Sequence, residues 1–351
     1  MSKYRNIRVL KGKASFLVDK KAISILMIMA VLAVIVFILS TGLGEMKISP
    51  LTVVKVFFGG GTEMEQLVIR SFRLPRILIA LIVGMSLAVA GGILQGIIRN
   101  PLASPDILGI TGGAAVAVVS FLTFFSDKNN SLTVSIQWLP LVAFCGAGVV
   151  AIAVYLLSWK NGVSPIRLVL IGIGISALTQ ALTTIMMISG PIYRASQANM
   201  WITGTVYGSN WTNVITLAPW AFIFLLISFM MARNLNIQEL GDEIATGVGS
   251  AVGKQRFILL MISTALIGSS VAFAGGIGFV GLMAPHMARR LVGSAFGALL
   301  PVSALIGAVL VMVADLIGRT VLAPIEIPAG VLTAGIGAPY FIYLLFKTRN
   351  A

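Results

Sequence analysis

Long apolar stretches follow one another along nearly the whole chain and limit its fold more than any other feature. Each is close to the 20 or so residues that a helix needs to cross a bilayer. Only 10% of the residues are charged, whereas a soluble domain has about 25%. We expect an all-α polytopic membrane protein in which residues 22–351 form one transmembrane domain. The stretches lie near 22–42, 75–98, 107–125, 137–158, 167–189, 213–232, 257–274, 277–288, 299–318 and 328–346.

The distribution of positive charge predicts how the chain is oriented in the membrane. Residues 1–21 contain seven lysines and arginines against one acidic residue, Asp19, and lack the pattern of a cleaved signal peptide. Positively charged segments tend to stay in the cytoplasm. We therefore expect 1–21 to be a basic cytoplasmic tail, and an even number of spans brings the C-terminus to the same face of the cytoplasmic membrane. The net charge of +14 then reflects topology, and nucleic acid is not an expected partner.

The stretch 275–290 combines four glycines, a proline, the only histidine and an arginine pair. Glycines let membrane helices approach closely, so this pattern favours a packed or kinked segment, although an ordinary span with an irregular end would also fit. The span 277–288 is too short alone, and we expect a turn at Gly275 and Gly276 before it. His286, beside Pro285, is more typical of a structural residue than of a catalytic one.

Several arginines fall on the side of the membrane where positive charge is unusual. Arg73 and Arg76 precede the second span, and Arg319 follows the ninth, so all three should lie at the outer face. Long side chains could simply reach the lipid headgroups. Alternatively, the arginines could form a basic surface that meets an acidic partner.

Two segments on the predicted cytoplasmic side have features of moving or contacting parts. Pro101 and Pro105 prevent a continuous helix in 99–109, which could be a plain loop or a gate. In 233–256, apolar residues at i, i+4 and i+8 predict a short amphipathic helix. That helix could contact another protein or lie solvated on the surface. The three apolar residues are Leu240, Ile244 and Val248.

The fifth span carries a polar stripe. Thr179, Gln180 and Thr183 lie close to helical spacing in an otherwise apolar stretch. They could line a translocation path or form hydrogen bonds between helices.

The chemistry that most enzymes need is absent from the sequence. One histidine, one cysteine (Cys145) and few carboxylates give no convincing metal centre, nucleophile–base pair or cofactor site. Residues 249–255 look like a phosphate-binding loop, but the spacing is one residue short and Gln255 replaces the hydroxyl that binds Mg²⁺. We therefore expect a transport subunit, not an enzyme, and any ATP hydrolysis must come from another chain.

Five motifs together resemble the FecCD/BtuC family, the permeases of ABC importers for iron-siderophores, haem and vitamin B12. The resemblance runs in order from about residue 45 to the C-terminus. The motifs are Arg73-Leu-Pro-Arg76, Asn100-Pro-Leu-Ala103, the block from Gly278 to His286, Ala314-Asp315 with Arg319, and Glu326-Ile-Pro-Ala-Gly330 leading to Gly337-Ala-Pro339.

The resemblance implies a ten-helix BtuC-like subunit that pairs with an identical or homologous permease. It also implies two cytoplasmic ABC ATPase subunits and an extracytoplasmic substrate-binding protein as partners. Residues that match family positions for docking the binding protein are Arg73, Arg76 and Arg319. Those that match a cytoplasmic gate are Asn100, Pro101 and Leu102, with Ser164 and Pro165 near a second gating position where the chain departs from the B12 permease pattern. A segment of about 237–249 matches the helix that couples to the ATPase, with Glu239, Leu240, Gly241, Glu243, Ile244, Ala245 and Gly249.

The family also suggests the cargo. Ferric siderophore is the expected substrate because most members carry one, with haem and cobalamin as alternatives. An ion-driven secondary transporter is a rival from another class, and it would place ionisable residues inside the membrane. Asp315, near a helix end, is the one candidate for such a residue.

Overall fold

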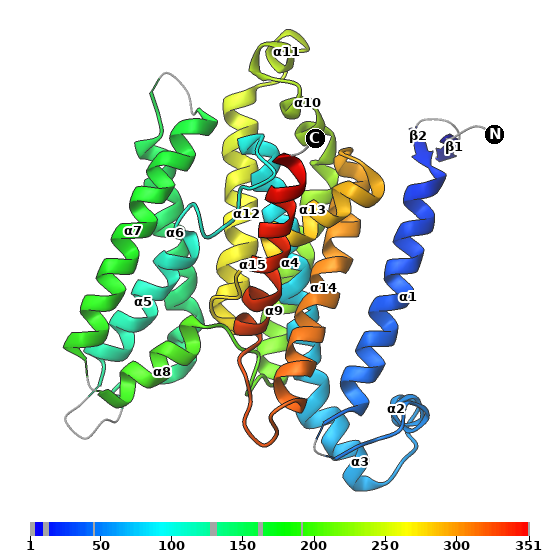
Figure 1. The fold of residues 1–351 in the computed structure, drawn as a ribbon, viewed down its shortest axis with the longest axis vertical. Helices are drawn as coiled ribbons and strands as arrows, with labels where there is room; N and C mark the ends of the chain where they lie inside the picture. Colours follow the sequence, from blue (N-terminus) through cyan, green and yellow to red (C-terminus); the bar gives the residue numbers. More distant parts are fainter. Residues whose placement is uncertain are drawn as a thin grey trace.

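The computed structural model describes residues 4–9, 14–44, 46–126, 132–160, 164–190 and 192–349. These residues are almost entirely helical (Figure 1). The α-helices are α1 (Lys20–Gly42), α2 (Pro50–Phe57), α3 (Glu63–Leu67), α4 (Leu74–Ile98), α5 (Ile110–Phe124), α6 (Leu139–Leu157), α7 (Pro165–Ser189), α8 (Ile192–Ile202), α9 (Trp211–Met230), α10 (Ala232–Glu239), α11 (Asp242–Gly247), α12 (Val252–Ala274), α13 (Val280–Val292), α14 (Phe296–Thr320) and α15 (Ala329–Arg349). A π-helical turn, η1 (Val68–Arg73), and a 3-10 turn, η2 (Ile136–Trp138), complete the helical elements.

Each expected apolar stretch corresponds to a helix, so the prediction of an all-α polytopic membrane protein is confirmed. Within the described residues, seven helical segments are long and apolar enough to cross a bilayer, and α5 and α15 contain shorter apolar helices. α13 is shorter still. Its 13 residues extend about 20 Å, less than the roughly 30 Å of a hydrocarbon core.

The segment expected to be a basic tail contains a β-hairpin. β1 (Tyr4–Val9) pairs antiparallel with β2 (Ala14–Asp19), and Tyr4 lies opposite Asp19. The sequence interpretation missed these strands because it weighed the charges above the β-branched and aromatic residues between them. Asp19 also caps α1, since its side chain accepts a hydrogen bond from the Lys21 amide.

α4 is the central helix of the bundle. It is buried along most of its length and packs against α9, α12, α13 and α14, which surround it in Figure 1. Glycines make the closest crossings: a Cβ on Gly91 would lie 1.8 Å from the Gly281 carbonyl oxygen, and one on Gly84 would lie 2.3 Å from that of Gly307. Small residues therefore bring α4 within backbone contact of α13 and α14.

The turn expected between the seventh and eighth spans is present. α12 ends at Ala274, and Gly275 has a φ of +66° that favours glycine. A Cβ on Gly275 would lie 2.0 Å from the carbonyl oxygen of Trp201 in α8. Glycine is thus needed here both for the turn and for the packing of α8 on it. His286, in α13, lies beside the ring of Tyr340.

The two ends of the bundle differ in structure. α2, α3 and α8 lie at one end, which we call the α3 end, whereas α10 and α11 lie at the other, the α11 end (Figure 1). Both termini lie toward the α11 end, as an even number of spans requires. α5 to α8 form a group at one side of the bundle, where α6 packs against α12, and α1 lies along the other side.

Candidate functional sites at the two ends of the bundle

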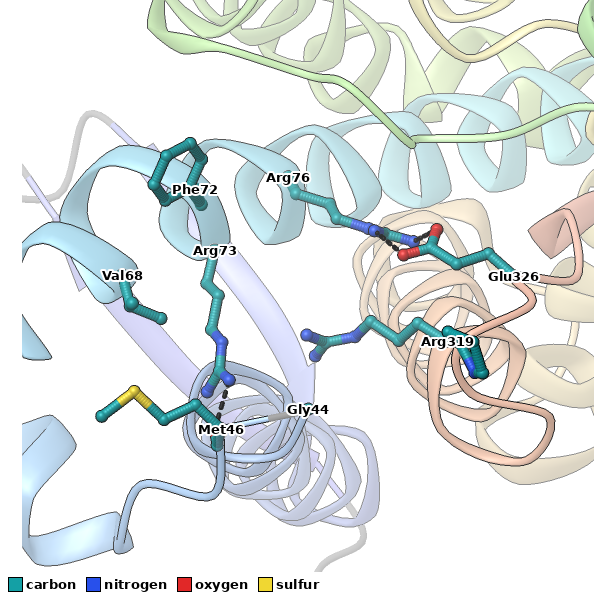
Figure 2. Close-up of a pocket in the computed structure, with 9 residues that line it drawn as sticks. Gly44, Met46, Val68, Phe72, Arg73, Arg76, Arg319 and Glu326 are labelled. Carbon is teal, nitrogen blue, oxygen red and sulfur yellow. Dashed lines mark hydrogen bonds and ion pairs between the residues drawn. The ribbon is translucent and has the colours of Figure 1, made fainter.

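The arginines singled out in the sequence meet at the α3 end. Arg73 ends η1, Arg76 lies in the first turn of α4, and Arg319 lies in the last turn of α14. Figure 2 shows their guanidinium groups converging on a cavity of about 340 Å³. We call these three residues the arginine cluster. The other residues that line the cavity are Gly44, Met46, Val68, Phe72, Pro324 and Glu326.

The π-helical turn explains how Arg73 reaches this cavity. The Leu74 amide donates to the Ile69 carbonyl, five residues back. Pro75 follows, and it has no amide hydrogen to continue the α-helical pattern. The turn is therefore wider than an α-helical one, a geometry often found at functional sites.

Arg73 serves mainly to hold the chain together. It is only 8% exposed, and Nη1 donates to the carbonyls of Thr41 and Gly42 at 2.9 and 2.8 Å. Nη2 donates to the Met46 carbonyl. These bonds fix the end of α1 and the segment that follows it against the start of α4. No carboxylate pairs with Arg73 among the described residues, so its charge adds to the potential of the cavity.

Arg76 is neutralised by two carboxylates from distant parts of the chain. Its Nε donates to Oδ1 of Asp315 at 2.9 Å, while Nη1 and Nη2 donate to Oε1 and Oε2 of Glu326 at 3.0 and 2.9 Å. Arg319 also pairs with Asp315, at 3.6 Å, and donates to the Ser40 carbonyl. Three guanidinium groups and two carboxylates leave one positive charge in excess.

These contacts correct the expectation of three outward-facing arginines. The cluster lines a cavity and is largely buried, and its charges are partly compensated within the chain. That arrangement is not an open basic surface, and docking of an acidic partner stays a prediction. Asp315 is also placed: its side chain is 3% exposed and paired with Arg76 and Arg319, which is unlike an isolated ionisable group on an ion path. Glu326, with a side chain 34% exposed, is the accessible carboxylate.

At the α11 end, the single amphipathic helix expected around 237–249 is two helices. α10 ends at Glu239 and α11 begins at Asp242. Gly241 lies between them with a φ of +113°, which breaks the helix. Leu240 and Gly241 are therefore the connection, Glu243, Ile244 and Ala245 belong to α11, and Gly249 follows it with a φ of +81°.

The apolar residues predicted to form one helical face are on the surface, but not on one helix. Leu240 precedes the break, Ile244 lies in α11 and Val248 follows it; all three are exposed, whereas Ala245 is fully buried. Exposed apolar side chains close together in a short segment are typical of a contact with another protein.

Ion pairs attach α10 and α11 to three membrane helices, and sequence reasoning did not find them. Nη2 of Arg256 in α12 lies 2.8 Å from Oδ1 of Asp242, and Nη2 of Arg99, after α4, contacts the same oxygen. Nη1 of Arg289 in α13 lies 2.8 Å from Oε1 of Glu239. Partial burial raises the pKa of Asp242. The hydrogen bonds and charges of Arg256 and Arg99 lower it by more than burial raises it, so the pKa falls below its usual range.

The residues expected to form a gate lie beside these ion pairs at the α11 end. α4 ends at Ile98, and Arg99 has a left-handed backbone with a φ of 55°. Asn100, Pro101 and Leu102 follow and are exposed, and the Leu102 amide donates to Oδ1 of Asn100 at 2.9 Å. Of the two residues expected near a second gating position, Pro165 begins α7 and Ser164 precedes it in an extended conformation.

The polar stripe of α7 is divided between two faces. Thr179 and Thr183 are buried, and their hydroxyls donate to the carbonyls of Ser176 and Thr179 in the same helix. A Cβ on Gly112 of α5 would lie 2.3 Å from the Thr179 hydroxyl oxygen. These threonines therefore pack toward α5. Gln180 is exposed and is the member of the predicted stripe that can face a path.

Known proteins resemble this chain over nearly its full length. The model of the FecCD transport family matches residues 32–347. The probable siderophore transport system permease protein YfhA of Bacillus subtilis (strain 168) is 61% identical over 333 residues, which cover 95% of this chain and 97% of YfhA. The iron(3+)-hydroxamate import system permease protein FhuG of the same organism is 48% identical over 328 residues, which cover 92% of this chain and 98% of FhuG.

A solved structure agrees with the sequence comparisons. It is assigned to the metal-chelate type of ABC transporter and is in an inward-facing conformation. It superimposes with a TM-score of 0.82 at 32% sequence identity, covering 92% of this chain and 99% of the solved one. The chain therefore belongs to the FecCD transport family.

Proposed function

We propose that this chain is the transmembrane permease subunit of an ATP-binding-cassette importer that moves a ferric siderophore across the cytoplasmic membrane. The observation that carries the proposal is the similarity to YfhA, which spans nearly all of both chains at 61% identity. Similarity to the iron(3+)-hydroxamate permease FhuG supports the same cargo class.

The partners follow from the two ends of the bundle. With the α11 end in the cytoplasm, the exposed apolar side chains of Leu240, Ile244 and Val248 contact an ABC ATPase, which hydrolyses ATP for the importer. A second permease, identical or homologous, completes a path between the two subunits, which Gln180 of α7 lines. The arginine cluster receives an acidic side chain of an extracytoplasmic binding protein, because its cavity holds one positive charge in excess.

Transport then requires the two ends to respond to each other. ATP binding moves the α11 end, and the path opens outward to take cargo from the docked binding protein. ATP hydrolysis then returns the importer to its starting conformation. Such a cycle needs contacts that differ between the two states. Asn100, Pro101 and Leu102, which are exposed where α4 ends, act as the gate on the cytoplasmic side, with Ser164 and Pro165 beside a second gating position.

Uptake of radiolabelled iron tests this proposal. Cells that lack other permeases of this family are compared with and without this gene under iron starvation, using ferric complexes of a hydroxamate siderophore, a catecholate siderophore and citrate. We expect uptake of one siderophore class to be lost and to return when the wild-type gene is restored. The same comparison in strains that each lack one binding protein identifies the partner.

Two outcomes would contradict the proposal in different ways. Loss of ferric citrate uptake alone would keep an iron-chelate importer but replace the cargo. Unchanged uptake of all three complexes would reject iron-chelate import.

A further inference from the structure

Asp242 joins three parts of the chain that are far apart in sequence. It is the first residue of α11, and its Oδ1 contacts both Arg99 and Arg256. Arg99 directly follows α4, whereas Arg256 lies buried in the first turns of α12. One carboxylate oxygen therefore connects α11 to the end of one membrane helix and the start of another.

The connection to Arg99 is double. Nε of Arg99 donates to the Gln238 carbonyl of α10 at 2.8 Å, while Nη2 contacts Asp242 of α11. The guanidinium plane is thus held on both sides of the break at Gly241. A guanidinium group is planar and its donors have fixed directions. When its partners move, both the position and the orientation of the Arg99 side chain must therefore change, so a displacement of α11 acts on Arg99.

Arg99 is also the residue at which the chain leaves α4 for the exposed segment 100–102. Its left-handed backbone, with a φ of 55°, is uncommon for a residue with a side chain and is retained where neighbouring contacts hold it. The contacts with Gln238 and Asp242 supply that hold. Loss of the Asp242 contact would loosen the start of the segment.

The ion pair of Glu239 at this end connects to a different membrane helix. Glu239 of α10 pairs with Arg289 near the end of α13, away from residues 100–102 in sequence. That pair attaches α10 to the bundle, whereas the Asp242 pair attaches α11 to the end of α4.

We propose that Asp242 is a positioning residue for transport, which passes movement of α11 through Arg99 to the segment Asn100–Leu102. The inference rests on the proposed function, in which α11 contacts the ATPase and this segment gates the path. Asp242 and Arg99 are both partly exposed, and ion pairs of exposed groups add little to stability. The pair with Arg99 therefore contributes to coupling, whereas the pair with the buried Arg256 also anchors α11 to α12.

The test uses the complete importer in proteoliposomes, with the binding protein and ferric chelate identified by the uptake experiment. Both chelate transport and ATP hydrolysis are measured for Asp242→Asn, which keeps the shape of the side chain but removes its charge. We expect the chelate transported per ATP to fall at least about fivefold, in the range typical of coupling free energies. Asp242→Glu, which keeps the carboxylate, should recover part of the loss.

A double-mutant cycle separates positioning from a structural role. Because the effect of Asp242 is passed on through its contact with Arg99, Arg99→Gln should also lower the ratio, and the double variant with Asp242→Asn should lose less than the sum of the two single losses. Lys254→Gln is the matched control, since it also removes an exposed charge at the α11 end and no ion pair of Lys254 occurs among the described residues.

The outcomes distinguish this inference from the function on which it rests. No chelate transport by the wild-type importer would reject the proposed function. Wild-type transport together with an unchanged ratio in Asp242→Asn, or with losses that add in the double variant, would overturn the role of Asp242 alone. A complex of Asp242→Asn that fails to assemble while Asp242→Glu and Arg99→Gln transport normally would also overturn it.

Discussion

Glu326 has an unusual position for a carboxylate beside the proposed docking cavity. Both of its oxygens accept hydrogen bonds from Arg76, and its side chain is accessible. An acidic side chain that enters the cavity and approaches Arg76 must share it with Glu326 or displace Glu326. Asp315, the other carboxylate paired with Arg76, is buried. Glu326 is therefore the carboxylate that an incoming acidic side chain can displace.

We therefore expect Glu326→Gln to strengthen docking of the binding protein. The substitution removes a negative charge near the incoming carboxylate, so Kd at low ionic strength should fall roughly threefold and approach the wild-type value at high salt. Titration of the binding protein against the purified importer measures this. Glu63→Gln, which removes an exposed acidic charge at the same end, is the control, and equal or weaker docking of Glu326→Gln would contradict competition at Arg76.

Helix α4 shows how the elements depend on small residues. Its crossings with α13 and α14 occur where a glycine on one helix faces a glycine on the other. Backbone cannot move aside as a flexible side chain can, so these crossings do not tolerate a methyl group. The same helix ends just before Arg99 and carries Arg76 in its first turn, so its packing holds both candidate sites in place.

Gly91→Ala is expected to destabilise the permease. The added Cβ would meet the Gly281 carbonyl oxygen at 1.8 Å, and overpacking of this kind costs about 2 kcal/mol or more. Thermal unfolding of the purified permease in detergent should show a lower Tm. Gly148→Ala in α6 provides the comparison because a Cβ there has no neighbour within 4 Å, and equal Tm values for the two variants would disprove the tight crossing.

At the scale of the whole molecule, the proposed function gives the two ends different tasks and places them in different compartments. The arginine cluster lies at the α3 end, whereas the Asp242 ion pairs and both termini lie at the α11 end (Figure 1). The proposed function requires the α3 end to face outward. Positive charge at the α11 end, including Lys254 and Arg290, agrees with that orientation.

Labelling of single cysteines tests the orientation. Cys145 is the only cysteine of the chain, so Cys145→Ser gives a background without thiols. We expect Glu63→Cys to react with a membrane-impermeant maleimide in intact cells, and Lys254→Cys to react only after the membrane is opened, because both positions are exposed at opposite ends. The reverse pattern would invert the topology.

The sequence by itself determined the helices, because the signal for a membrane span is local. Runs of apolar residues placed α1, α4, α6 and α7, and glycines at 275 and 276 located the turn before α13. Charge in the short connections indicated the topology, and short motifs identified the family. Each of these features depends only on residues that are close together in the sequence, so the sequence is enough to recognise them.

Only the tertiary structure decided how charged groups are matched and which way polar side chains face. Arg76 pairs with Glu326 across 250 positions, and Arg99 pairs with Asp242 across 143. Thr179 faces α5 because Gly112 leaves room for it there. An ion pair depends on the distance between two side chains after helices have packed, and neither composition nor spacing along the chain contains that distance.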